Sequence, residues 1–190
     1  MVSSLPLSRA DVVAAAGRVE PLLRRTPCVD VDVPVPHGGH TVTLKLESLQ
    51  VTGSFKPRGA LNSLLLADDA EVIACSGGNH GLAVAWAAAR LGRHATVVVP
   101  SSAARTKVDA MKRLGAEIVE RGDTPGEAFA YADELVAERG HPLIHPYDQV
   151  PTVAGQGTLG LELVEDAPPV KHWMVAVGGG GLPAGIVVSV

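Results

Sequence analysis

The residue best suited to chemistry is Lys56, which lies in the stretch TGSFKPRG at positions 52–59. A strand-like alternation over 41–46 leads into this stretch, and an apolar helical pattern beginning at Ala60 leads out. Lys56 is therefore expected at a junction between loop and helix, where the positive end of the helix dipole disfavours an ammonium group. A neutral amine there could attack an aldehyde and form a Schiff base. Taken alone, a lysine at such a place is more often a solvated surface residue.

A glycine-rich turn, Ser76-Gly77-Gly78-Asn79-His80, follows an apolar run at 71–75 that is expected to be a buried strand. Glycines let a ligand approach the backbone, and the free N–H groups at the start of the next helix suit a carboxylate. The Asn79 amide could also donate a hydrogen bond to a phenolic oxygen. An ordinary strand-to-helix turn explains the same residues without any ligand.

Four consecutive glycines, 178–181, follow a second expected strand at 173–177. Successive backbone N–H groups at a helix start bind phosphate without a basic side chain. The spacing from Gly179 to Ala184 also fits the dinucleotide pattern G-x-G-x-x-A. The acidic residue that completes that pattern, about 20 positions on, would lie beyond Val190. The nucleotide pattern GxxxxGK[ST] is absent, and we interpret the glycines as a phosphate site.

These three stretches resemble the threonine/serine dehydratases, in the fold-type II group of pyridoxal-phosphate enzymes. The segment ESLQVTGSFKPRGALN at 47–62 follows the family pattern E-x-x-Q-x-T-G-S-F-K-x-R-G-A. The turns at 76–81 and 178–182 resemble the family's S-[SG]-G-N-H-[AG] and G-G-G-G-L. The resemblance implies a pyridoxal 5'-phosphate cofactor bound to Lys56 as a Schiff base, with Lys56 also the catalytic base.

The resemblance also implies which residues contact the ligands. It assigns cofactor binding to residues of all three motifs: Lys56, Phe55, Asn79, Gly178, Gly179, Gly180, Gly181 and Leu182. It assigns the substrate carboxylate to Ser76, Gly77 and His80. A further stretch, 146–158 with Glu162 a turn later, looks like the family's D-x-x-x-x-x-x-G-Q-G-T segment, and we interpret most of it as helix packing.

The implied reaction is β-elimination, the dehydration and deamination of L-threonine or L-serine to a 2-oxo acid and ammonia. The β-replacement branch usually carries S-x-K-D-R and G-N-T-G, whereas this chain has Pro57 and His80 at the differing positions. Serine racemases of the family need a serine base at the position that matches Gly77. A third alternative is a truncated, catalytically incompetent fragment, because the resemblance covers only the first part of the family's fold.

The elements that must position these residues alternate along the chain. Helices are expected at 79–91, from 100 to about 114, and at 125–138, 152–165 and from 182 on, with strands at 28–33, 71–75, 94–99, 116–119, 142–144 and 173–177. Strands separated by helices of this length predict an α/β fold of open parallel sheets with helices on both faces. The resemblance divides it into two domains: 1–50 and 151–190 in a larger, incomplete domain, and 51–150 in a smaller one.

Composition excludes several classes of function. The hydrophobic fraction of 46% predicts a globular chain, and a net charge of −4 without a basic block argues against nucleic-acid and membrane partners. Cys28 and Cys75 lack metal or redox spacing, and the N-terminus lacks a signal-peptide pattern, so we expect a cytoplasmic protein. His37 and His40 have no neighbouring ligands, and no metal site is expected. The resemblance adds an amino-acid substrate and a homo-oligomer.

Overall fold

The computed structural model describes residues 7–35 and 38–190. Helices are α1 (Arg9–Val19), α2 (Lys56–Leu66), α3 (Asn79–Arg90), α4 (Arg105–Arg113), α5 (Pro125–Arg139), α6 (Val150–Asp166) and α7 (Gly181–Ser189), with short 3-10 turns η1 (Glu20–Leu22) and η2 (Glu47–Leu49). Strands are β1 (Cys28–Val35), β2 (Gly38–Lys45), β3 (Glu71–Cys75), β4 (His94–Val99) and β5 (Glu117–Glu120). Part of the loop that contains His37 lies outside the described residues.

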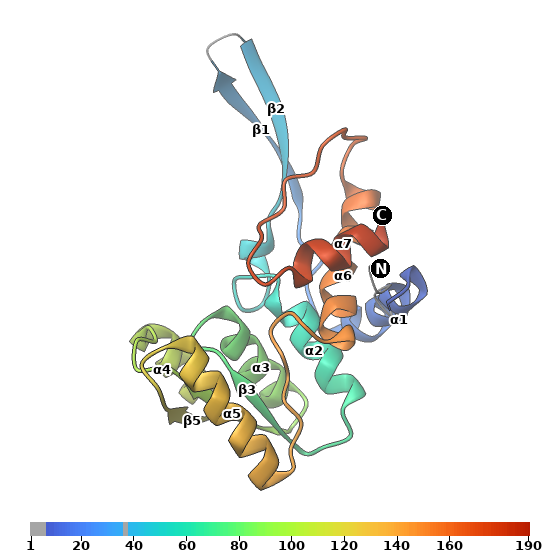
Figure 1. Cartoon of the computed structure of the whole chain (residues 1–190). Coiled ribbons are helices and arrows are strands. Elements are labelled where there is room, and N and C mark those ends of the chain that lie inside the picture. The colour runs from blue at the N-terminus through green and yellow to red at the C-terminus, as the bar shows by residue number, and fades with distance from the viewer. Residues whose placement is uncertain (1–6, 36–37) are drawn as a thin grey trace, which may run out of the picture.

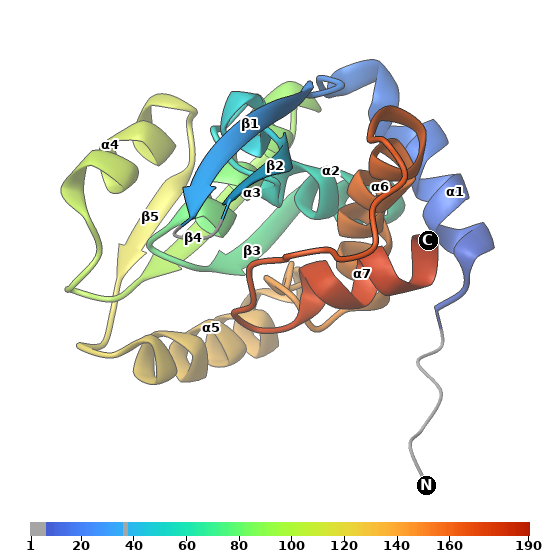
Figure 2. The same ribbon diagram turned by 90° about the horizontal axis from the view of Figure 1, so that it is seen from above.

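A parallel sheet in the order β3-β4-β5 forms the centre of one half of the molecule. Helix α3 connects β3 to β4 and α4 connects β4 to β5, which brings successive strands into parallel pairing. Alternate residues of a strand face opposite sides, so Val97 packs with α3 and α4 while Val98 packs with α5. Figure 2 shows α5 on one side of this sheet and α3 with α4 on the other. The predicted α/β architecture with both faces covered is confirmed.

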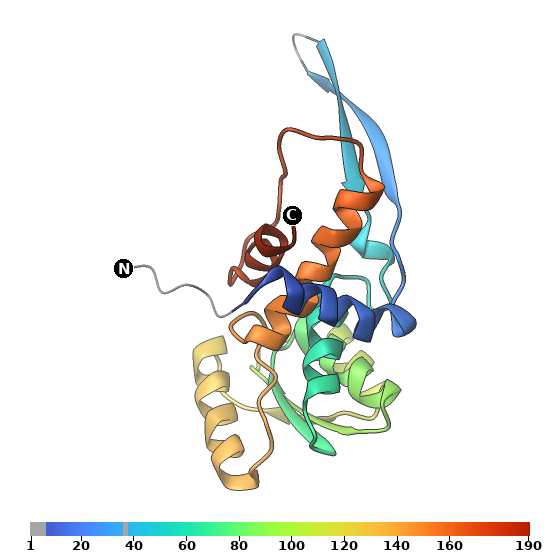
Figure 3. The same ribbon diagram turned by 90° about the vertical axis from the view of Figure 1, so that its right-hand side faces the viewer.

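The other half consists of α1, α6, α7 and the antiparallel hairpin β1–β2, which projects away from the parallel sheet (Figure 1). Helix α6 lies between α2 and α7, and Figure 3 shows α1 beside them. Glycines permit this packing: a Cβ on Gly155 would overlap the backbone of Arg58, and one on Gly160 would overlap the Ser189 hydroxyl. The backbones of three helices therefore approach one another at α6. The domain boundaries 1–50, 51–150 and 151–190 stay a prediction.

Three predicted elements differ in the structure. The segment 173–177 forms no strand, and Met174 and Val177 in it are 88% and 73% exposed. A strand needs a neighbour for its backbone hydrogen bonds, and none of the described residues pairs with this segment. The expected strand 142–144 is reduced to a single bridge between Leu143 and Ile73. Helix α4 begins at Arg105 rather than near 100, because a turn closed by Ala103 N–H and Pro100 O precedes it.

The N-terminal helix α1 begins with a capping box formed by Ser8 and Asp11. The Ser8 hydroxyl accepts a hydrogen bond from Asp11 N–H, and the Asp11 carboxylate accepts one from Ser8 N–H. This reciprocal arrangement satisfies two of the free donors at the helix start.

No helix among residues 7–35 and 38–190 is long and apolar enough to cross a membrane.

A buried ionic network connects α2 to α6. The guanidinium of Arg58, only 1% exposed, donates to Glu47 at 2.8 Å through two nitrogens and to Glu162 at 2.7 and 3.0 Å. Lys45 Nζ lies 2.7 Å from Glu162 Oε2, which Arg58 also contacts. Burial acts to raise the pKa of Glu162, but the hydrogen bonds and charges of Arg58 and Lys45 outweigh it and hold that pKa below its usual value. The network fixes the start of α2, where Lys56 lies.

Replacing Arg58 by Met should lower the free energy of unfolding by roughly 3–5 kcal/mol, because Glu47 would lose its cation and Glu162 would keep only Lys45, while both carboxylates stay mostly buried. The control is Arg25→Met, which removes a half-exposed arginine paired with Glu165 and Asp166 on the surface. That control should cost only about 0–1 kcal/mol. Urea unfolding followed by circular dichroism measures both. Equal losses in the two variants would contradict the structural role given to Arg58.

Candidate active site

Lys56 is the first residue of α2, as the sequence predicts for a junction between loop and helix. Its amine donates a hydrogen bond to Pro146 O at 2.7 Å and lies 5.2 Å from the centre of the Phe55 ring. Burial lowers the pKa of Lys56 to about 8. At pH 7 roughly a tenth of these amines are therefore neutral, far more than for a solvated lysine.

The segment 144–147 is where the predicted motifs come together. Pro146 O accepts the Lys56 amine and also the Gln156 amide, at 3.2 Å. Two residues earlier, Ile144 O accepts a hydrogen bond from His80 Nε2 at 2.8 Å. One residue later, Tyr147 lies against the second glycine motif. The structure thus brings both glycine turns and Lys56 to one short loop before α6.

The glycine bend 178–181 begins α7, and its fit against Tyr147 explains two of its glycines. A Cβ on Gly179 would overlap the Tyr147 ring, and one on Gly181 would lie 2.7 Å from Tyr147 O. Gly180 caps the helix with φ of 86°, a left-handed conformation that favours glycine. In the described part of the chain, the N–H groups of 178–181 have no hydrogen-bond partner. They form a concentration of free donors at the positive end of a helix.

Two apolar residues assigned to the cofactor lie together. Leu182 is buried in a small cluster with Leu159 and Ile186, and Phe55 packs against that cluster. Since Phe55 adjoins Lys56 and Leu182 adjoins the glycine bend, this packing brings the two motifs to the same side of the molecule.

The turn 76–80 is the third motif of the candidate site. Asn79 begins α3, and its Oδ1 accepts a hydrogen bond from Lys107 Nζ at 2.8 Å. Gly78 N–H donates to the Ser76 hydroxyl at 3.1 Å, which closes the turn. A Cβ on Gly77 would lie 2.5 Å from the Ala103 Cβ, so the turn packs tightly on the loop before α4.

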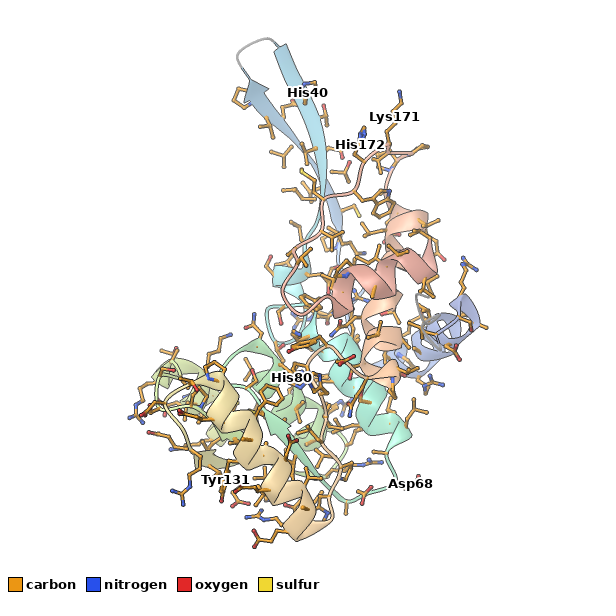
Figure 4. The ribbon with its side chains drawn as sticks, in the orientation of Figure 1. His40, Asp68, His80, Tyr131, Lys171 and His172 are labelled. Atoms are coloured by element: carbon orange, nitrogen blue, oxygen red, sulfur yellow. The ribbon has the colours of Figure 1, made fainter. Side chains whose placement is uncertain are left out.

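His80 lies in the interior, between the start of α3 and the loop before α6 (Figure 4). Burial lowers the pKa of His80 to about 3, so its ring is neutral at physiological pH. A neutral ring that donates to Ile144 O cannot attract a carboxylate by charge. Any contact between His80 and a substrate carboxylate must come from its backbone N–H, which is free in the first turn of α3.

The residues present fit pyridoxal phosphate. The free N–H groups at 178–181 suit its phosphate, the amine of Lys56 suits its aldehyde, and Asn79 offers an amide to its ring oxygen. Gln156 Oε1, buried beside Gly181, has no hydrogen-bond partner within the described chain, which leaves one polar atom open at the bend. The fit is one of chemistry and position, with the residue roles still predictions.

A group of potential metal ligands lies at the amino ends of the three parallel strands. Glu71, His94 and Glu117 have ligand atoms within 4.8 Å of one another. Arg139 Nη1 lies 3.0 Å from Glu117 and 3.6 Å from Glu71, so a guanidinium already compensates both carboxylates. The hydrogen bond from Arg139 lowers the pKa of Glu117. We interpret the group as an ion-pair network.

Two site residues were not singled out from the sequence. Tyr147 lies in the stretch we interpreted as helix packing; for Thr158 and Glu162 that interpretation agrees with their contacts to Arg58. An aromatic residue in a loop before a helix would have been the available signal. Lys107 carries no such signal, since a lysine on an amphipathic helix is ordinarily solvated.

Comparisons with known proteins match almost the whole chain. The profile of the family described as "Pyridoxal-phosphate dependent enzyme" matches residues 19–190. The chain belongs to this family. An L-threonine dehydratase, catabolic TdcB, of Staphylococcus aureus (strain USA300) is 40% identical over an alignment covering 96% of this chain and 54% of the relative. The chain therefore spans about half the length of the curated relatives it matches.

Solved structures agree in fold and extend the range of activities. A threonine deaminase from T.th. is 39% identical with a TM-score of 0.83, covering 96% of this chain and 60% of that one. A pyridoxal 5'-phosphate-dependent aspartate racemase is 36% identical with a TM-score of 0.91, covering 99% of this chain and 60% of that one. The family thus includes both deaminating and racemising members that resemble this chain.

Replacing Gly179 by Ala should lower the free energy of unfolding by roughly 1–3 kcal/mol, because the new methyl group would displace the Tyr147 ring. Gly178→Ala is a matched control one residue away, since nothing lies within 4 Å of its Cβ position. That control should change stability by less than about 0.5 kcal/mol. Urea unfolding compares the two. A Gly179→Ala variant as stable as Gly178→Ala would show that the ring does not pack on the bend.

Proposed function

We propose that this chain carries the cofactor-binding and catalytic residues of a pyridoxal-phosphate-dependent dehydratase. The reaction is the dehydration and deamination of L-threonine or L-serine to a 2-oxo acid and ammonia. The observation that carries the proposal is the Lys56 amine, partly buried, with a pKa of about 8, beside the loop that packs on the glycine bend. Family membership and the two threonine-deaminating relatives support it.

Each motif has a separate task in binding the cofactor. The free N–H groups of 178–181 and the N-terminus of α7 bind its phosphate, and Leu182 with Phe55 provides an apolar contact. Asn79 donates an amide hydrogen to its phenolic oxygen. When bound, pyridoxal phosphate delocalises the negative charge that develops at the substrate α-carbon.

Lys56 would hold the cofactor through its amine and would accept the α-proton of the substrate. Its amine must be neutral for both tasks, and burial makes the neutral form accessible near physiological pH. Pro146 O accepts a hydrogen bond from this amine and carries no negative charge, so it orients the amine without stabilising the ammonium as a carboxylate would.

The substrate carboxylate is assigned to the turn 76–80. The backbone N–H groups of Asn79 and His80 begin α3, where the helix dipole favours an anion. Ser76 contributes its hydroxyl, which now closes the turn on Gly78 N–H. The His80 ring contributes by fixing the turn to Ile144 O rather than by contact with substrate.

Racemisation is the main competing reaction, given the likeness to the aspartate racemase. The racemase interpretation requires a serine at position 77, on the face of the cofactor opposite Lys56. Here position 77 is glycine, and even a Cβ would lie 2.5 Å from the Ala103 Cβ. Glycine has no side chain that can exchange a proton, so position 77 favours elimination over racemisation. Chiral chromatography of recovered serine distinguishes the two reactions.

A second candidate function is cofactor binding without turnover. The chain spans about half the length of its relatives, and an apolar groove of about 840 Å³ lies between β2 and the segment 170–176. Trp173, Met174 and Val177 are exposed there or beside it. We propose that the complete reaction requires a protein in which this apolar surface is covered. The amino-acid substrate and the homo-oligomer remain part of the same proposal.

Pyridoxal phosphate followed by borohydride should leave one covalent adduct, on Lys56, because this amine is the most readily neutral lysine beside the glycine bend. Lys56→Ala should lose the adduct, the visible absorption band and any 2-oxo acid production. Lys112→Ala, an exposed lysine on α4, is the control and should retain them. Peptide mass mapping locates the adduct. Deamination that survives in Lys56→Ala would refute the catalytic role, whereas an adduct without deamination would support the second candidate.

The rate at which Lys56 reacts with a small amine-reactive electrophile should rise with pH and level off above about 8, because only the neutral amine reacts. The rate for a lysine side chain in a short unstructured peptide, added to the same sample, should continue to rise toward about 10.4, the ordinary lysine pKa. Mass spectrometry of initial labelling at each pH gives both profiles on the same sample. Coinciding midpoints for Lys56 and the peptide lysine would show that burial does not lower the Lys56 pKa.

A further inference from the structure

Lys107 makes a contact that the reaction scheme does not use. Its ammonium donates to Asn79 Oδ1 at 2.8 Å. Within the described chain no carboxylate lies within 4.0 Å of this ammonium, so the contact is not part of an ion pair. A lysine held by a neutral amide adds little to stability, so the main consequence of this contact is for the amide.

Packing between α3 and α4 fixes Lys107 relative to Asn79. Met111 is fully buried, and a Cβ on Gly81 would lie 2.9 Å from its sulfur. Lys107 lies one helical turn before Met111 on the same face of α4, and Asn79 is the first residue of α3, the helix that contains Gly81. The tight fit of Gly77 against Ala103 anchors the loop that leads into α4. The two partners are therefore presented to each other by rigid elements.

The contact has a chemical consequence for Asn79. An asparagine amide has one accepting oxygen and one donating NH₂ group, and a rotation of 180° exchanges their positions. A lysine ammonium can only donate. Lys107 thus requires the oxygen on its own side and turns the NH₂ group away from itself.

We propose that Lys107 is a positioning residue that orients the Asn79 amide so that its NH₂ group, rather than its oxygen, meets the phenolic oxygen of pyridoxal phosphate. The inference rests on the proposed function, because it concerns the same cofactor contact. It adds a residue from α4 that does not itself touch the cofactor.

The orientation can be measured without cofactor, by the side-chain NH₂ signals of Asn79 in a ¹H–¹⁵N spectrum. Their disappearance in Asn79→Ala assigns them. Lys107→Met should shift these signals, whereas Lys107→Arg, which keeps a donor, and Lys112→Met, which removes a charge elsewhere on α4, should leave them close to wild type. Signals that do not move in Lys107→Met would overturn the inference.

Cofactor affinity then tests what the orientation does, by titration of pyridoxal phosphate followed through its visible band. Lys107→Met should weaken binding roughly tenfold, as for the loss of one hydrogen bond, and Lys107→Arg should restore most of it. If Lys107 acts through Asn79, the double variant Asn79→Ala/Lys107→Met should bind within about twofold of Asn79→Ala alone.

The outcomes separate the inference from the proposed function. Additive losses in the double variant would mean that the Lys107 charge attracts the cofactor directly, which overturns the positioning role. An adduct on Lys56 together with a Lys107→Met variant that binds like Lys112→Met would overturn the inference alone. Absence of any adduct in the wild-type chain would overturn both.

Discussion

The carbonyl oxygen of Pro146 accepts hydrogen bonds from the Lys56 amine and the Gln156 amide, and the arrangement of the site depends on it. The neighbouring residues of the same loop accept the His80 ring and pack on the glycine bend. A carbonyl has two lone pairs and no charge, so it can hold two donors without fixing the protonation state of either. This is the environment that a lysine needs when it must exist as both amine and ammonium.

The buried charges around Arg58 supply the rigidity that this arrangement requires. Arg58 lies two residues after Lys56 and is bound on both sides by carboxylates from η2 and α6. Burying such ions costs desolvation, which their geometry must offset. Their benefit is specificity of position, since the start of α2 has few other arrangements that satisfy all these groups. The lysine is thus positioned by a charge network that it does not join.

Much of the fold could be predicted because local pattern and final packing agree. The strands at 71–75 and 94–99 and the helix beginning at Asn79 lie where hydrophobic periodicity and glycine turns place them. The strand predicted at 173–177 was wrong because an apolar pattern does not supply a hydrogen-bonding neighbour. Helix α4 starts late because the turn closed by Ala103 N–H and Pro100 O precedes it, and this turn packs on Gly77. Neither the missing neighbour of the segment 173–177 nor the packing of Ala103 on Gly77 is visible in the local sequence.

The sequence singles out candidate residues of the site but not the carbonyl groups and helix contacts that surround them. Lys56, Asn79 and the four glycines have residue types that chemistry requires at those points. Pro146 contributes only a carbonyl oxygen, which every residue has, so its residue type gives no sign that it accepts the Lys56 amine. The Lys107 contact depends on how two helices cross, which is equally hidden.

The two sides of α2 differ in mechanical stiffness. Toward α6 its backbone touches backbone, at Gly59 and Gly155, where no rotamer can change to absorb a displacement. Toward α3 it presents Ala60, Leu61 and Leu64 to alanines and valines, so this contact consists of non-directional apolar side-chain packing. A displacement between the layers would therefore be accommodated on the α3 side, which would move Asn79 relative to Lys56 while α2 stays in contact with α6.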